Sequence, residues 1–420
     1  MGDSRSLFSR YWFVWILLGL AALAGLTWAN YVYASENPGG NDFLVHWVGT
    51  RALIIDGISP YSDEVALDIQ TRAYGRPAQP GEHELRVAYP LYSVLVFLPY
   101  ALITDFTLAR AVWMTTLEVA LVALAFSSLR LTRWKLGLWA LAVYLIFSLL
   151  WYHSLRPLIN GNAVILVALL IGGALLAIRA GRDELAGVLL AFSTIKPQVV
   201  VVVIVFILLW TIFQRRWKTL FWFVVVLAML SALAALFVGD WPLQNLREIM
   251  RYSSYNPPGT LGSALATWMP GIGRQIGWVI TGLLVLLLLG EWGLALRKDF
   301  RWFLWTTCLT LTASQWIGIQ TDPGNFIVLL IAIVLIFAVW EERAGKKGRP
   351  VVWILMGLLF LVPWAIFLRT VNMVDQPIQS PIMFFPLPLY LFLGLYWVRW
   401  WATRPAKLLI EDLQEFDQEG

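Results

Sequence analysis

The sequence alternates between long apolar stretches and short polar segments from residue 11 almost to its end. A helix that crosses a bilayer needs about 20 consecutive, mostly apolar residues. The pattern therefore predicts membrane-spanning helices at 11–33, 106–129, 134–153, 158–178, 217–238, 275–296, 302–319, 324–340, 351–369 and 383–402.

The apolar stretch 185–213 is too long for one crossing, and Lys196-Pro197 interrupts it. Proline breaks a helix and also disfavours helical geometry at the residue before it. Two short helices that meet at Lys196 keep the basic residues around Arg179 and Arg215 on one side of the membrane. This interpretation brings the predicted total to twelve crossings.

Composition agrees with this pattern, because 59% of the 420 residues are hydrophobic and 14% are charged. Soluble domains carry about 25% charged residues. We therefore predict an all-α polytopic membrane protein, with one integral membrane domain over 1–420, and exclude soluble and disordered classes. The net charge of +5 belongs to the loops of such a protein and does not indicate nucleic-acid binding. With one cysteine and three histidines, we expect no metal site and no cofactor.

Basic residues gather in alternate loops, which predicts the orientation of the chain, because cytoplasmic loops are enriched in Lys and Arg. Both termini are then cytoplasmic, including the acidic tail 403–420, in a multi-pass protein of the cell (inner) membrane. The largest outer segment is 34–105, with surface helices at about 43–56 and 62–74 and an interfacial or re-entrant helix at 89–103. Core spans follow over 106–340, and two last spans over 351–402.

Ionisable residues near the bilayer are costly and are candidates for function. Asp42 begins the surface helix after the first span, where it acts either as a helix cap or as a catalytic carboxylate. His46 lies one turn further and is placed to pair with it. Lys196 lies at a helix break, where it either anchors the helix end or binds an anion.

Two further outer segments carry polar residues beside helix starts. Arg156 precedes Asn160-Gly161-Asn162, and Asp322 and Asn325 lie in a Pro-Gly turn. Each has a structural interpretation, as a cap, an interfacial arginine or a tight turn. Taken together, these residues place a carboxylate, cations and amides on one face of the membrane. A carboxylate accepts a proton from a hydroxyl and cations stabilise a departing phosphate, so the set favours group transfer from a lipid-phosphate donor.

Short motifs of the sequence resemble those of glycosyltransferase family 87. The most distinctive is an acidic residue after the first span followed by Asp-Gly-x-Ser-Pro-Tyr in the first outer loop. The motifs are Asp42, Ala52-Leu53, Asp56-Gly57-Ile58-Ser59-Pro60-Tyr61, Tyr89-Pro90, Gly161-Asn162 and Ile195-Lys196-Pro197. The resemblance covers residues 11 to about 340 and implies a GT-C fold and a mannosyltransferase that uses a polyprenyl-phosphate-mannose donor.

The resemblance implies that Asp42 is the general base of an inverting transfer to a lipid or glycan acceptor on the extracytoplasmic face. Because Lys196 and Arg156 are positively charged and are predicted to lie on the same side of the membrane as Asp42, we expect them to contact the donor phosphate. The expected substrate-binding residues are His46, Tyr61, Tyr89, Asn160, Asn162, Asp322 and Asn325. Relatives often carry a histidine near the start of the tenth span, where this chain has Asp322 and Asn325, so the choice of acceptor stays open.

Two other functions fit the same features. A transporter or lipid flippase also needs buried charges and broken helices, although a long amphipathic first loop and the lack of a sequence repeat argue against it. A lipid-linked acyl- or phosphotransferase would use a histidine or closely spaced carboxylates. The expected partners are the sugar donor, the acceptor and membrane lipids, with no nucleic acid. The sugar and the oligomeric state are left open.

Overall fold

The structure is a computed structural model that describes residues 12–255, 259–319, 321–373 and 377–404. Within these residues the chain is almost entirely helical. The strands found there are two residues each, and β1 (Asn372–Met373) pairs antiparallel with β2 (Pro377–Ile378). The predicted all-α polytopic membrane class is confirmed. The predicted acidic tail, from 405 onward, and the basic residues Arg5 and Arg10 lie outside the described residues.

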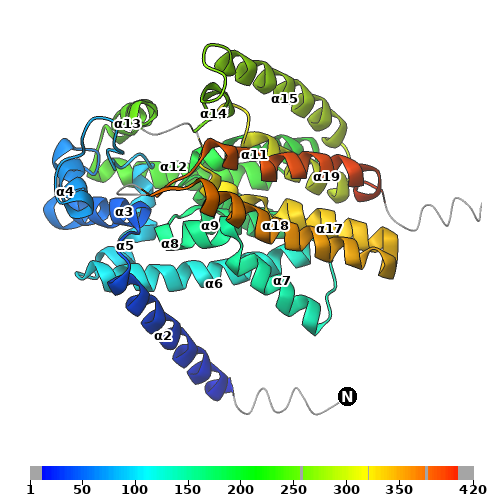
Figure 1. Ribbon diagram of the computed structural model, residues 1–420, viewed down its shortest axis with the longest axis horizontal. Helices are drawn as coiled ribbons and strands as arrows, with labels where there is room; N and C mark the ends of the chain where they lie inside the picture. The colour runs from blue at the N-terminus through cyan, green and yellow to red at the C-terminus, as the bar shows by residue number, and fades with distance from the viewer. Residues whose placement is uncertain (1–11, 256–258, 320, 374–376, 405–420) are drawn as a thin grey trace, which may run out of the picture.

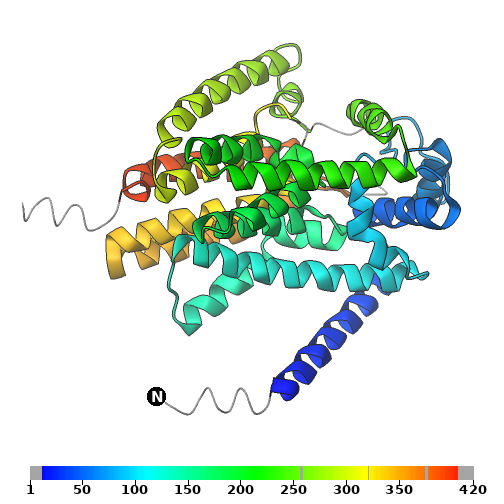
Figure 2. The ribbon, with the colours of Figure 1, turned by 180° about the vertical axis from the view of Figure 1, so that it is seen from behind.

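The long apolar helices run side by side as a bundle, with α2 and α15 leaning away from it (Figure 1, Figure 2). Their bounds are α2 (Trp12–Glu36), α6 (Phe106–Thr132), α7 (Leu138–Leu150), α8 (Tyr152–Asn160), α9 (Val164–Arg179), α10 (Asp183–Ser193), α11 (Pro197–Phe213), α12 (Trp217–Phe237), α15 (Gly273–Ala295), α16 (Phe300–Ser314), α17 (Leu330–Ala344), α18 (Arg349–Thr370) and α19 (Pro386–Ala402).

Seven helical segments of the described residues are long and apolar enough to cross a membrane, and eight are if the bent pair α7 and α8 forms one span. The predicted break at Lys196 is confirmed, because α10 ends at Ser193 and α11 begins at Pro197. Helices α9, α10, α11 and α16 have between 11 and 17 residues. The total of twelve crossings therefore stays a prediction.

Shorter helices gather at one end of the bundle, where α3, α4, α5 and α13 lie together (Figure 1). The helices predicted at 43–56 and 62–74 are found as α3 with η1 and as α4. The surface position predicted for the first is wrong, because α3 is buried from Phe43 to Thr50 where α5 packs against it. Segment 89–103 forms a helix too short to cross. Their bounds are α3 (Asn41–Arg51), η1 (Ala52–Asp56), α4 (Asp63–Tyr74), η2 (Leu91–Ser93), α5 (Val94–Ala101), α13 (Trp241–Tyr255), α14 (Leu261–Ala266), η3 (Pro323–Leu329), η4 (Gly345–Lys347) and η5 (Pro381–Phe384). Helix α13 lies in segment 239–274, which the sequence assigned to the outer face without predicting a helix there.

The basic loops meet at the other end of the molecule. Polar contacts at that end join the loops that the sequence assigned to the cytoplasm. The contacts are Arg179 to the carbonyl of Arg130, Arg216 to Asp183, Lys218 to Glu184 and Arg301 to Glu342. The common side of these loops agrees with the predicted topology, and the orientation in the cell stays a prediction.

Candidate active site

Asp42 is presented by the first turn of α3. Two glycines with positive φ, Gly39 at 140° and Gly40 at 77°, turn the chain from α2 into α3. Gly40 is the N-cap and no side chain caps the helix, so Asp42 lies just inside the helix and does not act as its cap. Its half-buried carboxylate is stabilised there by the helix dipole and is available to side chains from elsewhere.

The turn after α8 packs directly against α3. Gly161 has φ of 71°, and a Cβ at this position would lie 2.5 Å from the Cβ of Phe43. The Trp113 indole donates to the Gly161 carbonyl at 2.8 Å and fixes the turn. The next residue, Asn162, is thereby held beside Asp42, and its Nδ2 donates to Asp42 Oδ2 at 2.8 Å. Glycine at 161 is needed both for the positive φ and for this close approach.

Lys196 reaches the same amide from the break between α10 and α11. Its Nζ donates to Asn162 Oδ1 at 2.7 Å, and the backbone N–H of Val164 donates to that oxygen at 2.9 Å. Two donors on Oδ1 fix the orientation of the amide, so Nδ2 must face Asp42. The ammonium also lies over the Tyr89 ring, 5.4 Å from its centroid. Asn162 therefore bridges a carboxylate and a lysine that are far apart in sequence.

Burial and charge set the protonation of this bridge. Burial raises the pKa of Asp42, and the Asp322 charge adds to that, while Lys196, Asn162 and Arg156 lower it. Burial lowers the pKa of Lys196 to about 8, against the raising effect of Asp42 and Asp322. At neutral pH Lys196 is therefore mostly cationic. A carboxylate with a raised pKa is a better proton acceptor than an exposed aspartate.

An aromatic wall lies on the other side of Lys196. The His46 ring stacks on Phe97 and meets Tyr89 edge-on, with both centroid distances at 4.1 Å. Burial and the charge of Lys196 lower the pKa of His46 to about 3, so it is a neutral part of this wall. The Tyr61 hydroxyl donates to the Tyr89 carbonyl at 2.7 Å. Tyr61 thus holds the Tyr89 backbone in place. His46 packs against the aromatic rings of Phe97 and Tyr89.

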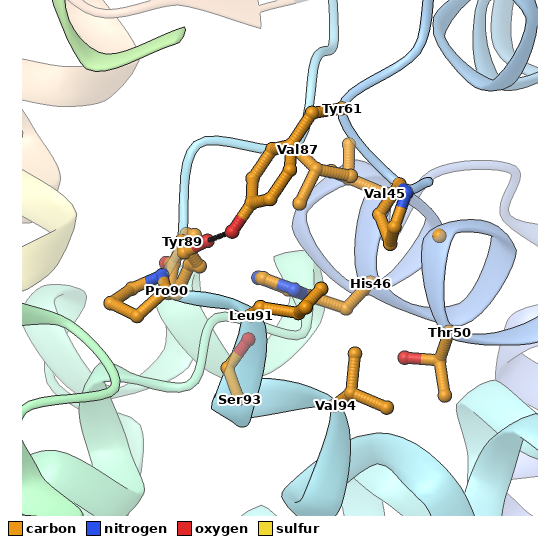
Figure 3. Close-up of a pocket in the computed structure, with 12 residues that line it drawn as sticks. Val45, His46, Thr50, Tyr61, Val87, Tyr89, Pro90, Leu91, Ser93 and Val94 are labelled. Carbon is orange, nitrogen blue, oxygen red and sulfur yellow. Dashed lines mark hydrogen bonds between the residues drawn. The ribbon is translucent and has the colours of Figure 1, made fainter. Parts of the chain in front are cut away.

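The wall encloses a small cavity lined by His46, Tyr61, Tyr89, Pro90 and neighbouring residues (Figure 3). Its volume of about 10 Å³ accommodates about one water molecule. A hexose is far larger, so this cavity is a packing gap behind the aromatic wall.

Arg156 and Asp322 lie near this bridge on the side of α8 and η3. Asp322 Oδ1 accepts from the Gly324 N–H at 2.6 Å, as expected for a tight turn, and Gln379 donates to Oδ2 at 3.2 Å. The charge of Arg156 lowers the pKa of Asp42, and a Cβ on Gly324 would lie 3.7 Å from Arg156 Nε and 2.6 Å from Asp322 Oδ1, so Arg156 lies beside the Asp322 turn. Asp322 is therefore a turn residue and also part of the charge environment of Asp42.

The remaining predicted residues lie at the margins of this cluster. Asn325 is buried and donates to the Thr321 hydroxyl at 3.1 Å. Asn160 ends α8 with a half-buried side chain. An imidazole does reach this region, because His153 Nδ1 lies 2.8 Å from the Pro323 carbonyl.

Helix α13 adds residues that sequence reasoning missed. Burial first, and then the charges of Asp42 and Asp322, raise the pKa of Tyr252, which places this tyrosine in the same electrostatic environment. Asn245 donates to the Tyr89 carbonyl at 3.0 Å. Their spacing of seven residues is typical of one helix face, which was the available signal. Among the described residues, no group of three or more His, Cys, Asp or Glu side chains is placed to hold a metal ion.

Part of the chain matches a known protein family. Residues 88–254 match the family model described as "Glycosyltransferase family 87". This range includes Tyr89, Arg156, Asn162 and Lys196 and is narrower than the range over which the motifs resemble the family. No curated protein and no solved structure matches the chain.

Proposed function

Because the chain belongs to glycosyltransferase family 87, we propose that it transfers a hexose from a polyprenyl-phosphate donor on the extracytoplasmic side of a membrane. Family membership together with the apolar helices makes it a membrane glycosyltransferase. Our proposal adds the donor, mannose as the hexose, a lipid or glycan acceptor and a GT-C fold. It also places both termini in the cytoplasm, with the protein in the inner membrane.

In the proposed reaction Asp42 is the general base. The acceptor hydroxyl oxygen attacks the anomeric carbon of the sugar, and its proton passes to the Asp42 carboxylate. The bond between the anomeric carbon and the phosphate oxygen breaks, and its electron pair leaves with polyprenyl phosphate. Attack opposite to the leaving group inverts the anomeric configuration. The half-buried position and raised pKa of Asp42 support this role.

Lys196 and Arg156 are proposed to contact the donor phosphate. A leaving phosphate gains negative charge in the transition state, and a buried ammonium stabilises that charge more strongly than one in water. The Lys196 side chain is 4% exposed and is fixed by the Asn162 amide, so it is already oriented. Of the residues expected to bind substrate, we assign substrate contacts to Tyr89, Asn160, Asn162 and Asp322. We assign supporting roles to His46 and Tyr61, which lie behind the Tyr89 ring, and to Asn325, which is buried and bonded to Thr321.

The observation that carries this proposal is the Asp42–Asn162–Lys196 chain. A base and a cation that took part in the same transfer must lie close together without neutralising each other by direct contact. The Asn162 amide keeps them in that arrangement through bonds of 2.8 Å and 2.7 Å. Transporters also use buried carboxylates, so the family match over residues 88–254 is what favours transfer over transport.

The test is sugar transfer by Asp42→Asn protein in proteoliposomes supplied with radiolabelled polyprenyl-phosphate mannose and a membrane lipid extract as acceptor. We expect product formation to fall by about 100-fold or more, because general base catalysis contributes about 10²–10⁴-fold. Asp68→Asn is the matched control, since this exposed carboxylate of α4 pairs with Arg72. It should retain full transfer.

Undiminished transfer by Asp42→Asn would remove Asp42 from the base role. Movement of the labelled lipid between leaflets without a new glycosidic product, in wild-type vesicles, would instead support the flippase alternative. Thermal unfolding of both variants in detergent checks that the loss is not one of folding.

A further inference from the structure

Helix α13 buries polar side chains together with aromatic ones and exposes several aliphatic ones, whereas a soluble surface helix buries its aliphatic side. Its buried face carries Asn245 and Glu248, exposed by 7% and 3%. On the opposite side, Leu243, Leu246 and Ile249 are 66%, 51% and 44% exposed. A 15-residue helix with this distribution cannot turn its apolar side inward without breaking its polar contacts.

The buried face is held firmly by the first outer loop. Glu248 accepts two hydrogen bonds from Arg86, at 2.6 Å and 3.1 Å. Asn245 donates to the carbonyls of Ala88 and Tyr89 at 3.1 Å and 3.0 Å. These bonds satisfy buried groups that would be costly to leave unpaired. The rotation of α13 about its own axis is therefore fixed, and the outward direction of its leucines is fixed with it.

The exposed apolar face of α13 continues the exposed apolar surface of the preceding helix, which is a candidate membrane span. Helix α12, a candidate membrane span, ends at Phe237 a few residues before α13 begins. Near its end Leu236 and Phe237 are 81% and 57% exposed. Figure 2 shows the end of α12 leading into α13 beside the outer-loop helices. Along α13 itself, the exposed Arg247 adjoins the leucines, in the arrangement that suits lipid phosphates above acyl chains.

We propose that α13 is a membrane-docked helix that lies along the lipid surface at the Asp42 end of the molecule. Leu243, Leu246 and Ile249 enter the boundary between headgroups and acyl chains, and Arg247 stays at the level of the phosphates. The chemistry of this partner is a phospholipid surface. The assignment holds whether or not the chain transfers a sugar, because it uses no property of the reaction.

Docking of α13 would also fix the position of Lys196 relative to the lipid headgroup layer. Asn245 holds the Tyr89 carbonyl, and Tyr89 packs against Lys196. A helix set at the headgroup layer therefore holds Lys196 at a constant distance from that layer. A phosphate carried by a lipid tail would meet the ammonium without leaving the depth at which lipid phosphates normally lie.

The test is site-directed spin labelling of the full chain in liposomes of phosphatidylcholine and phosphatidylglycerol. Single cysteines replace Leu243, Leu246 and Arg247 in separate variants. The unsubstituted chain gives the background, because its Cys308 is fully buried. Glu64→Cys on the exposed side of α4 is the aqueous reference, and Leu286→Cys, 68% exposed on α15, is the lipid reference.

Collisional relaxation by oxygen, which concentrates in lipid, is compared with relaxation by a water-soluble nickel chelate. We expect labels at 243 and 246 to resemble the Leu286 reference, with an oxygen-to-nickel ratio several-fold above that at 247. Ratios like that of the Glu64 reference at both leucine positions would place the face in water and overturn the proposal. Exclusion of both reagents, with immobilised spectra, would mean that protein covers the face, and would overturn it equally.

Discussion

Two buried charge networks lie at the same end of the molecule and are built differently. In the first, Arg86 binds Glu248 through two hydrogen bonds and also contacts Asp63 at 2.7 Å. In the second, Asp42 and Lys196 do not touch, because the Asn162 amide stands between them. In the first network the cation contacts its anions directly. In the second, the side chain of Asn162 separates the cation from the anion.

The difference separates a structural ion pair from the pair that we propose takes part in the reaction. A bidentate pair uses the donors of the guanidinium and the lone pairs of the carboxylate, which leaves little capacity for a substrate. Asp42 accepts one hydrogen bond from Asn162, and the Lys196 ammonium donates one of its three. Burial alone therefore does not mark a site, since both networks are buried. The proposed site differs because Asp42 and Lys196 keep hydrogen-bonding capacity that a substrate could use.

The largest contrast is expected in stability. Glu248→Ala leaves Arg86 buried beside Asp63 alone and should lower the free energy of unfolding by about 3 kcal/mol, because a buried charge that loses its partner is costly. Asp42→Asn should leave it nearly unchanged. Thermal unfolding in detergent, followed by intrinsic tryptophan fluorescence, measures both. Equal losses in the two variants would contradict the distinction.

A smaller effect is expected from removal of the bridging amide. Asn162→Leu deletes both hydrogen bonds that join Asp42 and Lys196, and bonds to charged groups contribute about 1.5–3 kcal/mol each. We expect kcat for sugar transfer to fall by about 10-fold or more. The Asn162 bond lowers the pKa of Asp42, so its loss raises that pKa and moves the acid limb of the pH–rate profile to higher pH. An unmoved acid limb would mean that Asn162 does not act through Asp42.

The alkaline side of the profile tests Lys196. Its pKa is lowered to about 8 by burial, so its charge, and the phosphate contact with it, is lost as pH rises through that value. Lys196→Arg replaces it with a group that stays protonated throughout. Profiles of kcat/KM between about pH 6 and 10 should show an alkaline limb in the wild type and none in the variant. A limb that persists in Lys196→Arg belongs to another group.

The smallest effect is expected behind the aromatic wall. Tyr61→Phe removes one hydrogen bond to the Tyr89 carbonyl, which Asn245 also contacts at 3.0 Å. The carbonyl therefore keeps a donor, and the cost should be about 1 kcal/mol of stability, with transfer reduced less than in Asn162→Leu. Parallel unfolding and transfer assays measure the two quantities. A loss of transfer as large as that of Asp42→Asn would place Tyr61 at the substrate.

Local patterns made part of this structure predictable. The break at Lys196-Pro197 and the helix that begins near Asp42 follow from proline chemistry and from apolar periodicity over a few residues. The pairing of Arg86 with Glu248 spans 162 positions, and nothing local in either segment indicates the other. Glu118 on α6 also has a partner that is distant in sequence, because Asn30 on α2 donates to its carboxylate at 2.9 Å. Sequence could locate the charges of the site, but the fold decides which of them meet.

The hydrogen bond between Asp42 and Asn162 forms only after both residues have been synthesised and inserted. The two residues are 120 positions apart, and ribosomes add about 5–20 residues per second. The carboxylate is therefore made several seconds before its amide, and Lys196 follows later still. Throughout that interval water at the membrane surface must solvate Asp42. Asp42 therefore begins as a solvated anion and gains its Asn162 partner only after the later helices are inserted beside it.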